Sequence, residues 1–402
     1  MQPLEDIEVT LKNEHIQEYV LKKLLLVLKY VMPENNKYLA KLEMSLQVLV
    51  LASTKKQTIH SICKDHKGTK SSVTIRNMLK LVFSSTELIE KYLNRVLKSL
   101  VKRKMLRGNI TICTDVVLIG YYGSAEKCDS EIKKGQKRNG TNKFHGYSSV
   151  YLRIKDQRYT LAVTYVWSHD SNLEIIRRLN RYVAAYGVKP SVWLLDRGYY
   201  SVDIIKWFHI NNKPFLMLVP KKGYKPTHSK GPTGTYVFQT WTKSGETEYT
   251  IRKKHNKDRI TTKMTVTLNY PNGPKNDPKI SVFAHFGLDH LTYRQLYDLY
   301  KTRFSIETSY RQMNQARART ASRSPSLRYL MFGVALILRN VWIFIHFHVL
   351  YKKQRGPGGK KIDFDKMTLI SMLTRLQDSI TSLFPVSCEI RIKDPTRLKA
   401  IA

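Results

Sequence analysis

Cysteine is scarce in this sequence, and the few cysteines form no recognisable pattern. The four of them, Cys63, Cys113, Cys128 and Cys388, are widely scattered and form no Cys-x-x-Cys pair. Neither a zinc ribbon nor a disulfide framework is therefore indicated. The N-terminus also lacks a basic stretch followed by an apolar stretch, so we expect no secretory signal and a cytoplasmic, nucleoid-associated protein.

Acidic residues are also few: 31 Asp and Glu stand against 69 Lys and Arg, a formal net charge of +38. Solubility alone needs far less charge, so a polyanionic partner is expected. The basic residues are spread along the whole chain, which indicates a charged surface and not a detachable arm. DNA is one candidate partner and an anionic membrane surface is another.

A long hydrophobic run, which would support the membrane alternative, occurs only at Leu330–Leu350. It contains Arg339, Asn340, His346 and His348, which are costly to place in hydrocarbon. The run therefore predicts a buried helix, and we expect no membrane partner. With 42% hydrophobic residues in 402, the chain has material for two or three globular domains.

Residues 1–108 have helical periodicity, as in EYVLKKLLLVLKYV, and are predicted to form an α-helical DNA-binding region. Within them, TIHSICKDHKGTKSSVTIRNMLKLV contains two short helical patterns around a Lys-Gly-Thr turn, which resembles a helix-turn-helix. A plain helical packing unit is the alternative. Basic side chains in the segment favour DNA: Lys64, Lys67, Lys70 and Arg76.

Residues 109–220 have the character of an α/β domain. Three β-rich runs, TICTDVVLIG, SSVYLRIK and YTLAVTYVWS, come before alternating helical and strand patterns. This order predicts a mixed sheet with flanking helices, as in ribonuclease H-like domains. Residues 221–280 are predicted to be a β-rich insertion that includes GTYVFQTW, and residues 281–352 to return to the α/β domain. Residues 353–402, which contain a Gly-Pro-Gly-Gly linker at Gly356–Gly359, are predicted to be a basic region and are a candidate for dimerisation.

Two aspartates occupy informative positions in the predicted strands. Asp115 interrupts a hydrophobic run, where an unpaired buried charge is costly and a metal ion would account for it; a solvent-facing strand position is the alternative. Asp196 ends the apolar strand VWLLD, and the carboxyl ends of strands are where α/β sheets bind ligands. Asp196 could instead cap the next helix, but Ser201 is the better cap candidate.

Glu307 is predicted to lie on a long helix. At 100° per residue its neighbours form one stripe, in which a carboxylate lies among phosphate-binding side chains: Tyr300, Arg303, Tyr310, Arg311 and Asn314. Taken alone, the stripe is more typical of a solvated helix with an Arg–Glu pair than of a catalytic site.

The spacing Tyr300-x2-Arg303-x3-Glu307 resembles the Tyr-Arg-Glu-Lys signature of the YREK group of insertion-sequence DDE transposases. Asp196-Arg197-Gly198-Tyr199 looks like the second-aspartate motif of that group, and Asp115 in a first strand looks like the first. The stretch SIETSYRQMNQARARTASRSPSLRYLMFGVALILRNVW is similar to the archaeal branch. The resemblance covers residues 109–350.

The resemblance implies a ribonuclease H-like catalytic domain, interrupted by a β-rich insertion between the second aspartate and the glutamate. It implies two Mg²⁺ or Mn²⁺ ions held by Asp115, Asp196 and Glu307, a ligand type that suits hard cations.

The remaining signature residues are assigned to DNA. The resemblance places Tyr300 and Arg303 near the cleaved end. The fourth signature residue should be Lys, but the sequence has Asn314, so Arg311 or Arg317 could supply the cation. Trp241 is either a core residue or an aromatic that stacks on a flipped base. Arg197, beside the second aspartate, completes the expected DNA-binding set.

The expected function is that of a DNA transposase that binds terminal inverted repeats and target DNA as a homodimer. A water would cleave at the element ends, and the freed 3′-hydroxyl would attack the target. No Gly-x4-Gly-Lys-Ser/Thr loop is found, and no ATP is expected. The alternatives are a catalytically inactive repressor derived from a transposase and a ribonuclease H-like nuclease.

Overall fold

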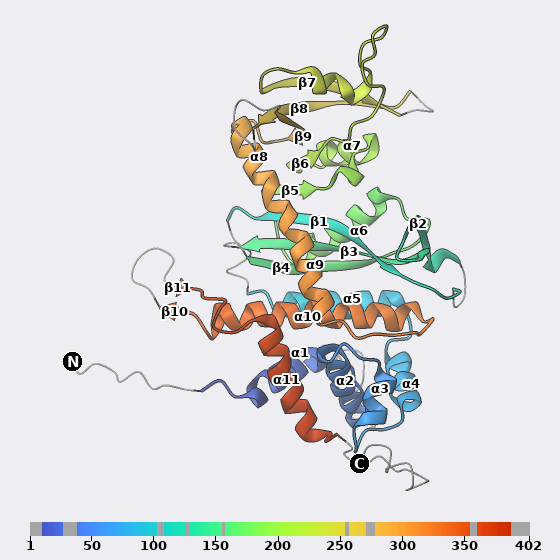
Figure 1. Ribbon diagram of the computed structural model, residues 1–402. Coiled ribbons are helices and arrows are strands. Elements are labelled where there is room, and N and C mark those ends of the chain that lie inside the picture. The colour runs from blue at the N-terminus through green and yellow to red at the C-terminus, as the bar shows by residue number, and fades with distance from the viewer. Residues whose placement is uncertain are drawn as a thin grey trace, which may run out of the picture. The chain divides into compact units, whose positions relative to one another are not determined.

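The computed structural model describes residues 10–26, 38–102, 106, 108–125, 129–154, 157–253, 257–270, 278–353 and 360–386. The chain forms two compact units (Figure 1). Unit 1 combines Met1–Val96 with Gln312–Ala402, and unit 2 is Leu97–Arg311. The helices α5 (Thr86–Ser99) and α9 (Ser305–Gln315) each begin in one unit and end in the other. The predicted catalytic residues all fall within unit 2.

Unit 1 is helical in the part of the chain that the structure describes, apart from a short β-hairpin. Its helices are α1 (Asn13–Leu26), α2 (Leu39–Thr54), α3 (Ile59–Asp65), α4 (Ser72–Val82), α10 (Pro325–His348) and α11 (Leu369–Leu383), and its hairpin is β10 (Lys352–Lys353) with β11 (Lys360–Lys361). Helix α11 packs against α1 and α2, so the C-terminal part of the chain completes the N-terminal helical core.

Helices α3 and α4 occupy the segment in which the sequence predicted a helix-turn-helix. The Thr58 hydroxyl accepts from the Ser61 amide at the start of α3 (3.0 Å), and Ser71 caps α4 in the same way. Between the helices Gly68 has a φ of +80°, a conformation that glycine adopts at little cost. The two-helix geometry is therefore present, and its binding to DNA stays a prediction.

Helix α10 is the hydrophobic run of the sequence. It is the one helix among the described residues that is long and apolar enough to cross a membrane, and 94% of its apolar window is buried inside the protein. Its polar side chains have internal partners: Arg339 Nε donates to Gln312 Oε1 (3.0 Å), and Trp342 Nε1 donates to the Met367 carbonyl (2.8 Å). This agrees with the prediction of a buried helix.

Unit 2 is built on one nine-stranded sheet, ordered β2-β3-β1-β5-β6-β9-β8-β7 with β4 paired to β3. The strands are β1 (Thr111–Gly120), β2 (Lys133–Arg138), β3 (Thr141–Ile154), β4 (Gln157–Val166), β5 (Val192–Leu195), β6 (Phe215–Leu218), β7 (Gly245–Arg252), β8 (Arg259–Asn269) and β9 (Lys279–Phe286). Strands β1, β5 and β6 are parallel to one another, and the other pairs are antiparallel.

The parallel strands lie at the centre of the sheet because their side chains can be buried on both faces. All four residues of β5 are buried, as are the first three of β6, which is typical of parallel strands covered on both sides. Helix α6 (Asn172–Ala185) packs on β3 and β4, α7 (Val202–Ile210) on β8, and α8 (Tyr293–Lys301) on β6 and β8. Unit 2 is thus a mixed sheet with flanking helices, as the sequence predicted.

The predicted β-rich insertion differs from expectation in one segment. GTYVFQTW was predicted as a strand, but Gly234–Thr240 is a 3-10 helix, η5. Gly234 turns the chain with a φ of +59°, and the buried Thr235 hydroxyl donates to the Pro220 carbonyl (2.6 Å) and accepts from the Lys222 amide (2.7 Å). These bonds to residues 13 and 15 positions earlier hold the segment in place of a strand ladder. Strands β7 to β9 continue the main sheet through the pairing of β6 with β9.

Candidate active site

The two aspartates predicted as catalytic lie side by side in the sheet. Strands β1 and β5 are parallel, and their last paired residues are Thr114 and Leu195. Asp115 and Asp196 come directly after these residues, at the next step of the register. Neighbouring strands are about 4.7–4.9 Å apart, so the register alone brings the two carboxylates together at the carboxyl end of β5. Their side chains are 24% and 32% exposed.

Asp196, at the end of β5, does not cap the helix that follows it. Asp196 makes no side-chain capping bond to the 3-10 helix η4 (Arg197–Tyr199). Ser201 caps α7 instead, accepting from the Ile204 amide, as predicted. The Asn172 side chain donates to the Gly198 carbonyl (2.8 Å) and so holds the turn after Asp196. The Asp196 carboxylate is therefore available for other partners.

The position of Asp115 is fixed through its backbone. Its carbonyl accepts hydrogen bonds from the Ser148 hydroxyl (2.8 Å) and the Tyr310 hydroxyl (3.2 Å). The Ser149 hydroxyl lies 2.9 Å from that of Tyr310, and burial raises the pKa of Tyr310 well above its ordinary value. Tyr310 therefore stays protonated and links α9 to β1. The carboxylate itself accepts from the Val116 amide at 2.8 Å.

The Arg303 guanidinium lies against both aspartates. Its Nη2 is 3.0 Å from Asp196 Oδ1, and its Nη1 is 3.9 Å from Asp115 Oδ2. Arg303 is only 5% exposed. Burial would lower the pKa of this guanidinium, but the neighbouring Tyr300 and the two carboxylates raise it above its ordinary value. One buried, permanently charged side chain thus joins two carboxylates that would otherwise repel each other.

Tyr300 has an internal role next to Arg303. It is 2% exposed, its hydroxyl donates to the Leu195 carbonyl (3.2 Å), and its ring packs against Phe283 at 5.0 Å between centroids. Burial raises the pKa of Tyr300 to about 12, so the hydroxyl remains a donor. Tyr300 therefore ties α8 to the residue that precedes Asp196. Contact of Tyr300 and Arg303 with DNA stays a prediction.

The long helix predicted around Glu307 is in fact interrupted. Helix α8 ends at Lys301, a 3-10 turn η6 (Thr302–Phe304) follows, and α9 begins at Ser305. Tyr300, Arg303 and Tyr310, which the sequence placed on one stripe, are all buried despite this interruption. Glu307 is in the first turn of α9. Its side chain lies outside the described part of the structure, so its convergence with the two aspartates stays a prediction.

The other predicted DNA-binding residues lie in several places. Arg197 and Arg311 are exposed in unit 2. Asn314 and Arg317 belong to unit 1, where Arg317 Nε donates to Asn314 Oδ1 (3.2 Å). Trp241 is half-buried and packs on Phe238, with 6.0 Å between ring centroids.

Among the described side chains no three His, Cys, Asp or Glu residues gather at one point. Asp115 and Asp196 supply two possible metal ligands, and a third ligand to a metal ion stays a prediction. Glu307 is the acid that the sequence motif provides for this place.

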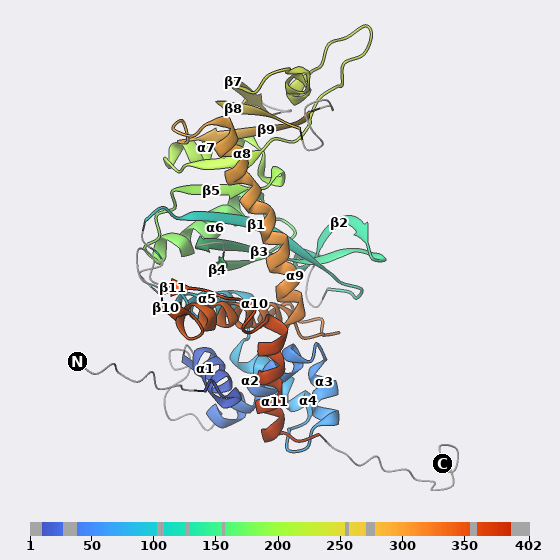
Figure 2. The same cartoon turned by 60° about the vertical axis from the view of Figure 1, so that its left-hand side comes forward.

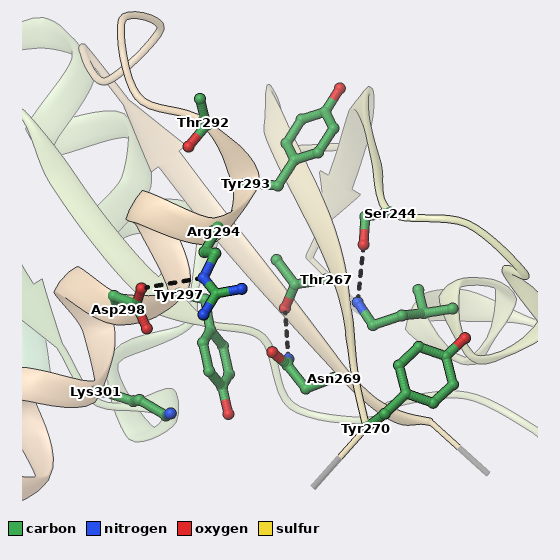
Figure 3. Close-up of a pocket in the computed structure, with 11 residues that line it drawn as sticks. Ser244, Thr267, Asn269, Tyr270, Thr292, Tyr293, Arg294, Tyr297, Asp298 and Lys301 are labelled. Carbon is green, nitrogen blue, oxygen red and sulfur yellow. Dashed lines mark hydrogen bonds and ion pairs between the residues drawn. The ribbon is translucent and has the colours of Figure 1, made fainter. Parts of the chain in front are cut away.

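A cavity of about 570 Å³ lies on the exposed side of α8 (Figure 3). Tyr293, Tyr297 and Lys301 line it from the helix, and Tyr270 lines it from the end of β8. The Lys301 Nζ lies 4.6 Å from the centre of the Tyr297 ring, and Tyr270 and Tyr293 are 45% and 42% exposed. Aromatic faces beside a cation suit a planar, anionic ligand. Lys301 is the last residue of α8, two positions before Arg303 in the sequence.

Sequence reasoning missed the residues that position Asp115. Ser148 and Ser149 lie in the middle of β3, and nothing in their immediate sequence distinguishes them from other strand serines. Tyr310 was part of the predicted stripe, but its bond to the Asp115 carbonyl follows from tertiary packing. The cavity on α8 likewise depends on the packing of α8 on β8, which no local pattern predicts.

Comparison with known proteins shows that the chain has a transposase-like fold. The solved structure of a piggyBac transposase, in a synaptic complex with hairpin DNA, is similar to it with a TM-score of 0.53 and 9% sequence identity. The similarity covers 95% of this chain and 82% of that chain. No protein-family model and no curated protein matches the sequence.

The contacts of Arg303 predict unequal energetic coupling to the two aspartates. In double-mutant cycles of Arg303→Gln with Asp196→Asn, we expect a coupling of about 1–2 kcal/mol, at the lower end for a charged hydrogen bond because Asp196 is partly solvated. The cycle with Asp115→Asn should give less, since the distance is longer. Urea unfolding of the purified variants measures both, and equal couplings would contradict the geometry.

Proposed function

We propose that this protein is a DNA transposase whose unit 2 is a ribonuclease H-like catalytic domain. The observation that carries the proposal is the pair of aspartates at neighbouring positions of two parallel strands, held by one buried arginine. The transposase-like fold supports it, and so does the net charge of +38, which suits a protein that binds DNA.

The donor set fits a divalent metal site. Asp115 and Asp196 offer carboxylate oxygens, the ligands that Mg²⁺ and Mn²⁺ prefer, and Glu307 is proposed as the third ligand. A buried guanidinium beside both carboxylates indicates that this position attracts a cation. Two such ions, when bound, stabilise charge on the attacking and leaving oxygens of a phosphodiester.

The residues around the carboxylates supply rigidity. Tyr310 and Ser148 hold the backbone of Asp115, Tyr300 holds the end of β5, and Arg303 orients both carboxylates. A ligand held in this way needs little reorganisation before it binds a cation or a phosphate. Arg303 also carries a charge that can pair with a DNA phosphate close to the aspartates.

The proposed reaction has two steps. Water attacks the phosphodiester at each element end and releases a 3′-hydroxyl. That hydroxyl then attacks a target phosphodiester; one P–O bond forms as another breaks, and a proton passes from the attacking hydroxyl to the leaving oxygen. Bond count is conserved in the second step, so ATP is not needed. A homodimer that holds both ends is proposed for the assembly.

Cleavage assays with Asp196→Asn test the proposed function. The substitution keeps the size of the side chain but removes the charge, so cleavage of labelled duplexes from the DNA flanking the gene should fall to background. Affinity for the same duplexes should stay within a few-fold of the wild-type value. The matched control is Asp289→Asn, which should leave cleavage unchanged because this carboxylate is 57% exposed and lies outside the cavity on α8.

The alternatives give different products in the same assay. Wild-type protein that binds without cutting would indicate a repressor. Cuts without joined products would indicate a ribonuclease H-like nuclease. Cleavage that persists in Asp196→Asn would remove this residue from the active site.

The cavity on α8 is proposed as part of the DNA path. Tyr293→Ala removes an exposed ring from its wall, and stacking of a base on an aromatic ring contributes about 1–3 kcal/mol. We expect a clear loss of affinity for single-stranded DNA in anisotropy titrations, with little change for duplex. Tyr224→Ala is the matched control, since Tyr224 is 79% exposed and lies outside the cavity. Equal effects of both substitutions would exclude the cavity from DNA binding.

A further inference from the structure

The hairpin of β2 and the start of β3 is a ribbon formed by Lys133–Arg138 and residues 141–144. A two-residue turn connects its strands, with Arg138 paired to Thr141. Asn139 and Gly140 have φ values of +48° and +85°, as a type I′ turn requires. Figure 2 shows the ribbon projecting from the sheet of its own unit. The ribbon is a regular hairpin, and Phe144 is its only hydrophobic side chain.

The ribbon carries a dense, unbalanced charge. Five cations lie within residues 133–143, and no Asp or Glu occurs anywhere in residues 132–155. The five are Lys133, Lys134, Lys137, Arg138 and Lys143. All except the half-buried Lys133 are exposed. In the described part of the chain none of them forms an ion pair, and the Lys143 ammonium donates to the Gly123 carbonyl at 3.5 Å.

Two of these cations face each other across the strands. Lys134 and Lys143 are direct partners in the antiparallel register. Like charges at directly opposed positions destabilise a sheet, and a single acidic residue at either position would remove this cost. Folding of the hairpin therefore gains nothing from this pair. A polyanion bound across the ribbon would turn the repulsion into attraction.

The ribbon is nevertheless held firmly around its turn and beneath its first strand. The Tyr122 hydroxyl donates to the Asn139 carbonyl (2.7 Å), and the buried Thr141 hydroxyl donates to the Tyr121 carbonyl (2.7 Å). Phe144 is buried beneath the first strand, where a Cβ at Gly135 would lie 3.5 Å from its ring. The cations are thus presented from a fixed backbone.

We infer that this ribbon is a docking surface for double-stranded DNA, which it contacts through the phosphates. A two-stranded ribbon fits the major groove, which is about 12 Å wide. Residues 133–143 contain no aliphatic or aromatic side chain that could stack on an unpaired base or enter a lipid bilayer. The inference rests on the proposal that the protein acts on DNA, and it adds a sequence-independent contact outside the active site.

Lys134→Glu tests the inference because it should change stability and binding in opposite directions. The new carboxylate faces Lys143, so the melting temperature should stay the same or rise. Affinity for a labelled duplex of arbitrary sequence, measured by anisotropy without divalent metal, should fall several-fold. Lys189→Glu makes the same change of charge at an exposed lysine elsewhere in unit 2 and is the matched control.

The salt dependence gives a second measure. Each lost phosphate contact lowers the slope of log affinity against log salt by about 0.9, so the triple variant Lys134→Gln, Lys137→Gln, Arg138→Gln should lower it by about 2–3. A slope and affinity equal to those of the Lys189→Glu control would overturn the inference. The inference would also be overturned if the triple variant lost binding to phosphatidylserine vesicles but kept its affinity for duplex DNA. The ribbon would then be a membrane-binding surface.

Failure of the ribbon and failure of the proposed function are separable, because binding is measured on uncut DNA. If wild-type protein cuts and joins DNA while Lys134→Glu binds normally, the ribbon inference is wrong and the function stands. If Lys134→Glu loses affinity in a protein that never cuts, the ribbon is supported and catalysis is not.

Discussion

Repulsion between two carboxylates is the constraint on which the rest of unit 2 depends. The parallel register of β1 and β5 places Asp115 beside Asp196, and a folded chain must neutralise that pair. Arg303 does so from the interior, at 3.0 and 3.9 Å. Arg303 lies in the turn η6 between α8 and α9. Tyr300 packs beside its guanidinium and donates to the carbonyl of the residue before Asp196.

The central features of this arrangement could be predicted from the sequence. Asp115 and Asp196 each follow a short apolar run that forms a buried strand, so their place at strand positions was visible in the pattern of residues. The spacing of Tyr300 and Arg303 also marked them as functional. The sequence could not show that this face packs inside the protein, because helical periodicity groups side chains on one face but does not say what that face contacts.

Other features of the fold could not be predicted, because their sequence signal was weak or depended on distant residues. Strand β2 consists of Lys, Gly, Gln and Arg, which have low strand propensity, although Asn139-Gly140 is a strong hairpin signal. The segment around Thr235 has a strand-like sequence but forms a 3-10 helix, because Thr235 hydrogen-bonds to residues 13 and 15 positions earlier. The grouping of α11 with α1 and α2 depends on contacts between opposite ends of the chain, which no local pattern records.

The central claim is that Asp115 and Asp196 form a cation site shared with Glu307. Anomalous diffraction from crystals grown with Mn²⁺ tests it most directly. The account predicts Mn²⁺ peaks about 2.0–2.2 Å from oxygens of both aspartates, with Glu307 in contact with at least one peak. Mn²⁺ bound elsewhere, with the Arg303 guanidinium still holding both carboxylates at saturating metal, would contradict it.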